Sequence, residues 1–84
     1  MWQYNHKKNK KMSDNFTATY KAIGKALKKK RKEKGLTQQQ LADGAEIDRS
    51  KISDMENGKE DFQFSTLLKL CKALGVSVAE IFKN

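Results

Sequence analysis

Hydrophobic residues recur three or four positions apart along most of this 84-residue chain, in five successive segments. That interval places side chains on one face of an α-helix. Proline, which interrupts helices, is absent from the sequence. No segment shows the apolar–polar alternation of a half-buried strand. The sequence therefore predicts an all-α protein, a compact bundle of five helices.

Residues that begin or end helices separate the five segments. A hydroxyl residue followed three positions later by Gln or Glu forms a capping box, as at Thr37 with Gln40 and at Ser77 with Glu80. Glycines follow three segments, as at many helix ends: Gly35, Gly58 and Gly75. We expect helices from about Thr17 to Lys34, from Thr37 through Asp43, from Asp48 to a stop at Asn57 and Gly58, from near Ser65 to Gly75, and from Ser77 to Phe82.

The inward faces of these segments are expected to form the hydrophobic core. Its members are Ile23, Leu27, Leu36, Leu41, Ala42, Ala45, Ile47, Ile52, Met55, Leu67, Leu70, Leu74, Val76 and Ile81. In the fourth segment Leu68 and Cys71 are also expected to point inward. With one cysteine, the chain has no internal disulfide framework.

Positive charge is concentrated in the first part of the chain. Residues 1–34 carry a net charge of +10 and residues 35–84 one of −2, which gives the total of +8. Residues 1–15 are polar and aperiodic, so we expect a flexible basic arm there and the folded domain over 16–84. This distribution favours a polyanionic partner, either nucleic acid or an anionic membrane surface. A tail that only aids solubility is the alternative.

Several functional classes are not expected. No apolar run approaches the roughly 18–20 residues of a membrane span, and the N-terminus lacks the apolar region of a secretory signal. One His and one Cys cannot form a usual four-ligand zinc site. No nucleophile–base pair is apparent. We therefore expect neither an enzyme nor a cofactor, metal or membrane partner.

The second and third segments are short and are separated by only three or four residues near 44–47. Two helices joined so tightly suggest a helix-turn-helix motif. On the third segment one continuous outward face carries Arg49, Ser50, Ser53, Asp54 and Asn57. Short donors and acceptors can approach base edges in a major groove. An ordinary solvated helix surface is the alternative.

The stretch GLTQQQLADGAEIDRSKISDMENGK resembles the Cro/phage-repressor type of helix-turn-helix, also called the xenobiotic-response-element type. The likeness continues backward over IGKALKKKRKEKG and forward over STLLKLCKALGVSVAEIF, and it covers about residues 20–83. It implies a repressor-like bundle of five helices that binds operator DNA as a homodimer.

The resemblance also implies roles for individual residues. Arg49, Ser50 and Asp54 would read bases. By their chemistry, Arg49 suits guanine O6 and N7, and Asp54 accepts from cytosine N4. Gln38 would bond a phosphate and brace the recognition helix. The remaining residues expected to contact phosphates are Lys51, Ser53, Asn57 and Lys59.

Arg31 and Glu56 match two positions at which the family forms a structural ion pair between the first and third helices. Two departures from the family pattern concern the turn and the loop after the third helix. Glu46 stands where the family commonly has glycine with positive φ, and Gly44 is a candidate for redirecting that turn. Glu60 and Asp61 place negative charge where basic or neutral residues often face phosphate.

The sequence thus predicts a sequence-specific double-stranded DNA-binding transcriptional regulator. It would be a bacterial or phage repressor that acts as a homodimer on a palindromic operator. Its expected location is the cytoplasm, with nucleoid association in a bacterial cell. The alternative is a protein-interaction module or antitoxin-type protein with weak DNA contact, whose partner is a toxin or a regulator. The acids Glu46, Glu60 and Asp61 favour this alternative.

Overall fold

The computed structural model describes residues 9–59 and 61–83, with side chains from residue 16 onward. The helices in these ranges are α1 (Asn9–Glu33), α2 (Gln38–Ala45), α3 (Arg49–Glu56), α4 (Phe64–Leu74) and α5 (Val78–Lys83). The described residues contain no strand. The prediction of an all-α bundle with five helices is therefore confirmed.

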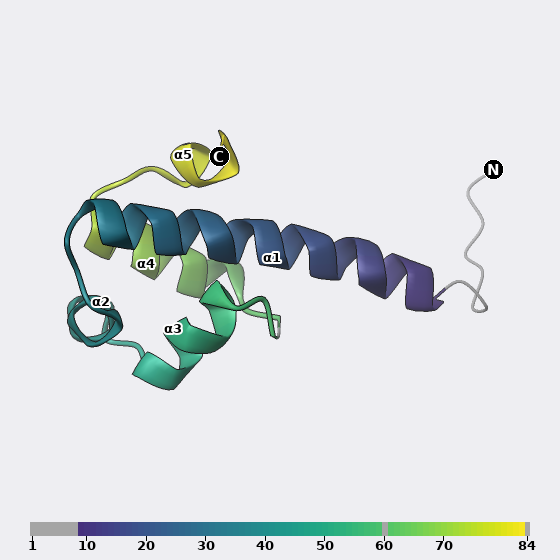
Figure 1. The fold of residues 1–84 in the computed structure, drawn as a ribbon, viewed down its shortest axis with the longest axis horizontal. Helices are drawn as coiled ribbons and strands as arrows, with labels where there is room; N and C mark the ends of the chain where they lie inside the picture. The colour runs from purple at the N-terminus through teal and green to yellow at the C-terminus, as the bar shows by residue number, and fades with distance from the viewer. Residues whose placement is uncertain (1–8, 60, 84) are drawn as a thin grey trace.

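Helix α1 is the long axis around which the other helices are arranged (Figure 1). Helices α2 and α3 lie on one side of α1, α4 lies behind it, and α5 lies on the side away from α2 and α3. Helix α1 contacts α3, α4 and α5, and α2 contacts both α3 and α4. Across the described ranges, no helix has the length and hydrophobicity that a bilayer crossing requires.

The apolar faces of the five helices meet in one core. Its buried members are Ile23, Ala26, Leu27, Leu41, Ala42, Ala45, Ile52, Met55, Leu67, Leu70, Cys71, Leu74 and Ile81. Leu36, Ile47 and Val76, which were also expected there, pack against this core but remain partly exposed. The remaining members of the predicted core are all buried.

The inward orientation expected for Leu68 is wrong, since 44% of this residue is exposed. Helix α4 buries Leu67, Leu70, Cys71 and Leu74, whose intervals of three, one and three residues form a single stripe. Leu68 is one residue beyond Leu67, so the helical rotation of about 100° per residue turns it away from that stripe.

Helix α1 begins at Asn9, earlier than the predicted start at Thr17. Residues 9–15 are therefore helical, in contrast to the expected aperiodic arm, whereas residues 1–8 lie outside the described residues. Neither proline nor glycine occurs between Asn9 and Phe16, so the backbone can extend the helix beyond the part that packs on the core. The first turns of α1 project past the other helices (Figure 1).

Both predicted capping boxes are formed. The Gln40 backbone N–H donates to Thr37 Oγ1 at 3.0 Å, and the Thr37 N–H donates to Gln40 Oε1 at 2.9 Å. At the start of α5 the Ser77 N–H donates to Glu80 Oε1 at 3.0 Å. This backbone hydrogen bond, helped by the positive charge of Lys30, lowers the pKa of the Glu80 carboxyl. The caps fix where α2 and α5 begin.

Candidate nucleic-acid interface

A three-residue turn joins α2 to α3. Its first residue, Glu46, adopts the left-handed conformation with φ 57° and ψ 46°, as expected for this position. The N–H groups of Glu46 and Ile47 both donate to the carbonyl oxygen of Ala42. Asp48 then begins α3 as its N-cap, although its side chain makes no capping hydrogen bond. The turn thus ends one helix and starts the next without a longer loop.

The suggestion that Gly44 redirects this turn is wrong. Gly44 lies inside α2, and among the described residues the positive φ of a non-glycine residue occurs at Glu46. A Cβ atom at Gly44 would meet the Cβ of Ala73 at 3.8 Å, an ordinary van der Waals distance. Neither the backbone conformation nor the space available requires glycine at this position, so the turn depends on Glu46 itself.

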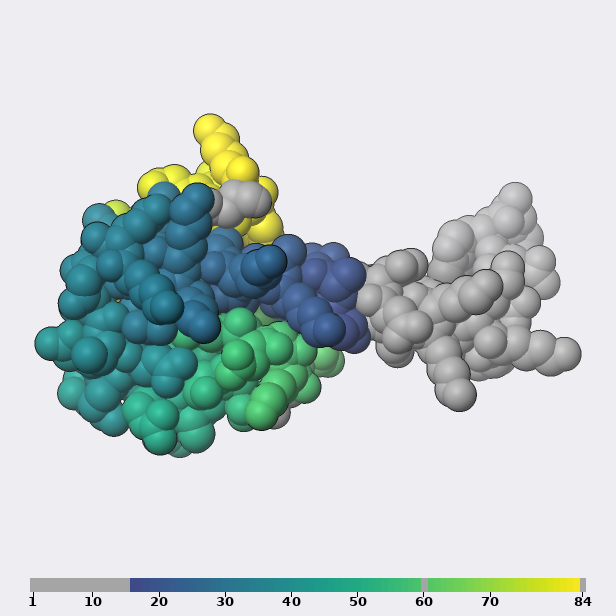
Figure 2. Space-filling model, viewed as in Figure 1, coloured from purple at the N-terminus to yellow at the C-terminus, as the bar shows by residue number. Residues whose placement is uncertain are grey.

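Helix α3 has one buried and one exposed face. Ile52 and Met55 are exposed by only 1% and 0%, and they anchor the helix on the core. Arg49 and Ser50 are exposed at its N-terminal end, and Asp54 is half-buried one turn later. In the space-filling view α2 and α3 form the lower side of the body, with no other helix over them (Figure 2). The three predicted base-reading residues are therefore on an accessible helix.

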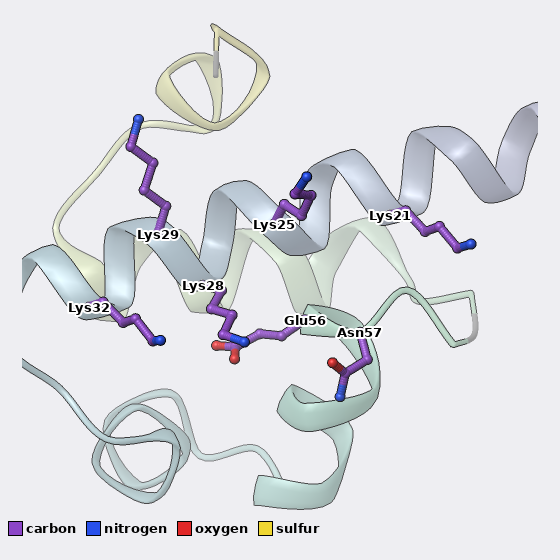
Figure 3. A pocket seen from close by; sticks show the side chains of 7 residues that line it. All are labelled: Lys21, Lys25, Lys28, Lys29, Lys32, Glu56 and Asn57. Atoms are coloured by element: carbon purple, nitrogen blue, oxygen red, sulfur yellow. The ribbon is translucent and has the colours of Figure 1, made fainter.

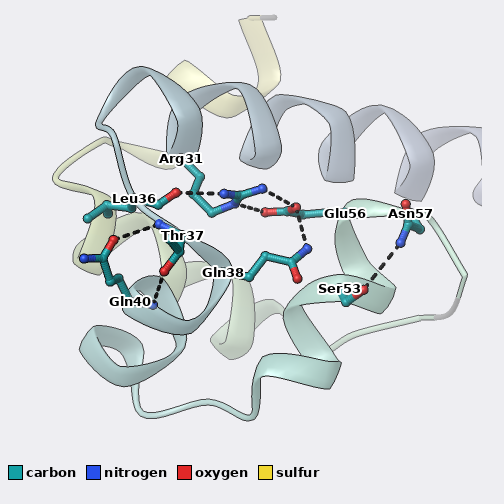
Figure 4. A network of polar contacts seen from close by, with 8 residues as sticks. All are labelled: Arg31, Leu36, Thr37, Gln38, Gln40, Ser53, Glu56 and Asn57. Atoms are coloured by element: carbon teal, nitrogen blue, oxygen red, sulfur yellow. Dashed lines mark hydrogen bonds and ion pairs between the residues drawn. The ribbon is translucent and has the colours of Figure 1, made fainter.

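Four polar groups hold α3 against α1 and α2 (Figure 4). Arg31 of α1 donates from Nε to Glu56 Oε2 at 2.7 Å and from Nη2 to Glu56 Oε1 at 3.1 Å. Arg31 Nη1 also donates to the Leu36 carbonyl oxygen at 2.7 Å, and Gln38 Nε2 donates to Glu56 Oε1 at 3.0 Å. Arg31 and Glu56 thus form the ion pair that the resemblance implied, and it is buried.

This network defines what Gln38 does in the folded chain. Its amide nitrogen is bonded to Glu56, so the side chain links the first turn of α2 to the last turn of α3. The bracing of α3 that was expected of Gln38 is therefore present, as this hydrogen bond. The phosphate contact expected of Gln38 stays a prediction.

The other predicted phosphate-contacting residues are not all on one face. Asn57 Nδ2 donates to Ser53 Oγ at 3.5 Å, which keeps these two together on the outward stripe of α3 (Figure 4). Lys51 lies off this stripe, and its Nζ donates to the Asp61 carbonyl oxygen at 3.4 Å. Lys59 is exposed just beyond α3. Glu60, one of the acids noted in the sequence, lies outside the described residues.

Gly24 is a positioning residue that the sequence reasoning missed. It is buried in α1, and a Cβ atom there would lie 2.0 Å from the carbonyl oxygen of Met55. Real Cβ atoms do not approach oxygen so closely, so only glycine allows α1 to rest directly on the last turn of α3. A glycine in the interior of a helical segment was the available signal, because glycine costs helix stability without such a packing reason.

Cys71 lies in the core and away from this interface. Burial raises the pKa of its thiol, and the negative charge of Glu80 raises it further. The thiol is therefore protonated at neutral pH, which favours a packing role over reactivity.

Two short helices joined by a three-residue turn, with the second helix buried on one side and polar on the other, define a helix-turn-helix protein. Residues 27–81 match the Helix-turn-helix family, and the chain belongs to that family. The resemblance to the Cro/phage-repressor type is thereby confirmed.

The relatives in sequence include regulators of different systems. The chain is 45% identical over 60 residues to the competence pilus inhibition repressor of Acinetobacter baylyi, a match that covers 71% of this chain and 54% of that protein. The chain thus spans about half the length of that relative. It is 39% identical over 63 residues to the control protein C.MunI of a Mycoplasma species, covering 74% of this chain and 85% of that protein.

Solved structures of restriction-modification controller proteins share the fold. That of C.AhdI from Aeromonas hydrophila superimposes with a TM-score of 0.75 at 34% identity, over 77% of this chain and 98% of the other. The C.Esp1396I tetramer in complex with its natural 35 base-pair operator gives a TM-score of 0.71 at 33% identity, over 76% of this chain and 84% of the other.

Proposed function

We propose that this protein is a sequence-specific, double-stranded DNA-binding transcriptional regulator that represses by occupying an operator. The observation that carries the proposal is the exposed polar face of α3, which the buried Arg31–Glu56 pair holds in place. A helix presented in this way can enter the major groove, where each base pair offers a distinct pattern of donors and acceptors. The protein acts by binding, without catalysis, in the cytoplasm.

Base reading is assigned to the N-terminal half of α3. Arg49 donates two hydrogen bonds to guanine O6 and N7, and Asp54 accepts one from cytosine N4. Ser50 lies beside Arg49 and can donate to or accept from a base. All three side chains lack an intramolecular hydrogen bond within the described part of the chain, so their polar atoms are available to a ligand.

Phosphate contacts fix the position of the protein on the duplex without reading sequence. We assign them to Gln38, Ser53, Asn57, Lys59 and Lys51. Gln38 retains its side-chain oxygen and one N–H beyond the bond to Glu56, and the first N–H groups of α2 lie beside it. The ammonium group of Lys51 carries three N–H donors, and the structure shows a contact of this group with the Asp61 carbonyl oxygen.

The protein is proposed to bind a palindromic operator as a homodimer, with recognition helices about 34–36 Å apart, one turn of B-DNA. The operator-bound tetramer of C.Esp1396I supports assembly of copies on DNA.

An aromatic groove offers a dimer contact. It is lined by Phe16, Tyr20, Ile23, Phe62, Phe64 and Phe82, together with Thr19 and Leu67. Its three most exposed aromatic residues, Phe16, Phe64 and Phe82, are each more than half exposed.

Selection of bound sites from a random duplex pool tests the proposal. We expect a two-fold symmetric consensus. Arg49→Ala should lower the discrimination at one position of each half-site by about 1–3 kcal/mol. The control is Lys72→Ala on α4, which also removes one exposed positive charge.

An unchanged consensus for Arg49→Ala would contradict the assignment of the base reader. Failure of the unmodified protein to prefer any duplex would overturn the proposed function and favour the protein-interaction alternative.

A further inference from the structure

A row of lysines on α1 borders the end of α3. Lys21, Lys25, Lys28 and Lys32 follow one another at intervals of four, three and four residues, so they share one helix face. They line a groove together with Lys29 of α1 and with Glu56 and Asn57 at the C-terminal end of α3 (Figure 3). We call the first four residues the lysine row.

Two glycines bring the lysine row close to α3. At Gly24 a Cβ atom would lie 2.0 Å from the Met55 carbonyl oxygen, and at Gly58 it would lie 3.0 Å from Lys21 Cα. Helix α1 therefore rests directly on the last turn of α3 and on the residues just after it. The lysine row and the outward face of α3 consequently form adjacent parts of one surface.

The positive charges of the lysine row are not neutralised within the described residues. None of its four ammonium groups takes part in an ion pair or hydrogen bond there. The carboxylate of Glu56 lies in the same groove, but Arg31 and Gln38 already occupy both of its oxygens. Four like charges on one helix face repel one another, and an anion placed along them relieves that repulsion.

We propose that the lysine row binds the phosphates of a DNA strand that runs along the edge of the groove entered by α3. This inference rests on the proposed function. Lys21 and Lys32 are eleven residues apart, so at about 1.5 Å per residue the row is about 16 Å long. A strand presents a phosphate about every 3.4 Å of helix axis, so a row of this length can neutralise several.

A DNA strand suits this surface better than an anionic membrane. A helix that lies on a membrane buries an apolar face beside its basic one. The groove beside the lysine row is instead bordered by the polar side chains of Glu56 and Asn57. The larger hydrophobic residues of this part of α1, Ile23 and Leu27, are buried in the core together with Ala26.

The test compares two double variants, with changes in α1 or just after its end, that lose the same charge. K25Q/K28Q removes two members of the lysine row. K30Q/K34Q removes two lysines that act electrostatically on Glu80 of α5, the helix on the other side of α1. Lysine and glutamine have similar helix propensities, so the helix should form equally in both variants.

The measurement is the affinity for the selected operator as a function of salt concentration. The slope of log K against log salt is negative, and each lost phosphate contact should reduce its magnitude by about 0.9. We expect a reduction in magnitude of about 1.8 for K25Q/K28Q, so that the factor by which affinity falls between about 50 and 200 mM salt becomes about tenfold smaller. K30Q/K34Q should keep the slope of the unmodified protein. Both variants should keep the base preference, since phosphate contacts carry no sequence information.

Phosphate ethylation interference on the same operator gives a second readout. K25Q/K28Q should become insensitive to ethylation at two neighbouring phosphates in each half-site at which the unmodified protein is sensitive. Equal slopes and equal interference patterns for the two double variants would overturn the inference. The inference would also be overturned if K25Q/K28Q lost binding to phosphatidylserine vesicles while the salt dependence of its operator affinity stayed unchanged. If the unmodified protein prefers no duplex, the proposed function itself has failed.

Discussion

At the residue scale the interface depends on how the buried carboxylate of Glu56 is hydrogen-bonded. Glu56 is only 5% exposed, yet three nitrogen donors share its carboxylate. Arg31, 8% exposed, is likewise satisfied, because its third donor nitrogen bonds the Leu36 carbonyl. A fully hydrogen-bonded ion pair need not be net stabilising, but the loss of one partner leaves an uncompensated buried charge.

Glu56→Gln should therefore destabilise the protein strongly. The Arg31 guanidinium would remain buried without a counter-charge, at a cost of about 3–5 kcal/mol in the free energy of unfolding. Urea denaturation followed by circular dichroism measures this loss. The control is Glu33→Gln, which removes the exposed ion pair with Lys30 at 3.6 Å and should cost less than about 1 kcal/mol. Equal losses in the two variants would show that the buried pair does not hold α3.

At the scale of elements the turn between α2 and α3 carries a strained residue. Glu46 has φ 57°, a conformation that costs a side-chain-bearing residue about 1–2 kcal/mol. Glu46→Gly should remove this cost, and the greater freedom of glycine in the unfolded chain should offset part of the gain. We expect a net increase in stability of about 0.5–1 kcal/mol, measured as a higher urea midpoint.

The control for this prediction separates backbone conformation from charge. Glu46→Ala removes the carboxylate and keeps a Cβ atom at positive φ, so it should give little or no stabilisation. A gain in Glu46→Ala as large as that in Glu46→Gly would assign the effect to charge and contradict the explanation from φ.

The elements themselves could be predicted because their signals are local. Capping boxes such as Thr37 with Gln40 act over three residues, and the buried stripe of each helix follows from its own periodicity. The positive φ at Glu46 could also be anticipated, from its position in the family pattern. The early start of α1 could not, because no apolar pattern accompanies its first turns.

The candidate site was only partly predictable for a related reason. The outward face of α3 follows from helical geometry, and the pairing of Arg31 with Glu56 followed from the family resemblance. The close approach at Gly24 and the Leu36 carbonyl in the network depend on how helices pack in three dimensions. Likewise, the basic residues of α1 gave no indication in the sequence of which lysines lie beside α3.

At the scale of the whole molecule, the aromatic groove is an apolar surface in addition to the basic one formed by the lysine row. The rings of Tyr20 and Phe62 meet edge to face within it, with centroids 4.9 Å apart. The side chains of Phe16, Phe64 and Phe82, from α1, α4 and α5, remain largely exposed around it. Exposed apolar residues that gather at one groove mark an association surface more often than scattered ones do. Two copies of the chain joined there would bury these side chains together.

Phe82→Ser should weaken the proposed dimer. Phe82 is 58% exposed in the single chain, so its removal should change the stability of the monomer little, whereas a dimer contact would lose a buried aromatic side chain. Sedimentation equilibrium should show at least a tenfold increase in the dimer dissociation constant, and operator binding should become weaker and less cooperative. The matched control is Leu68→Ser, since Leu68 is 44% exposed and does not line the groove. A dimer that Phe82→Ser leaves intact, or that Leu68→Ser weakens equally, would place the contact between copies elsewhere on the molecule.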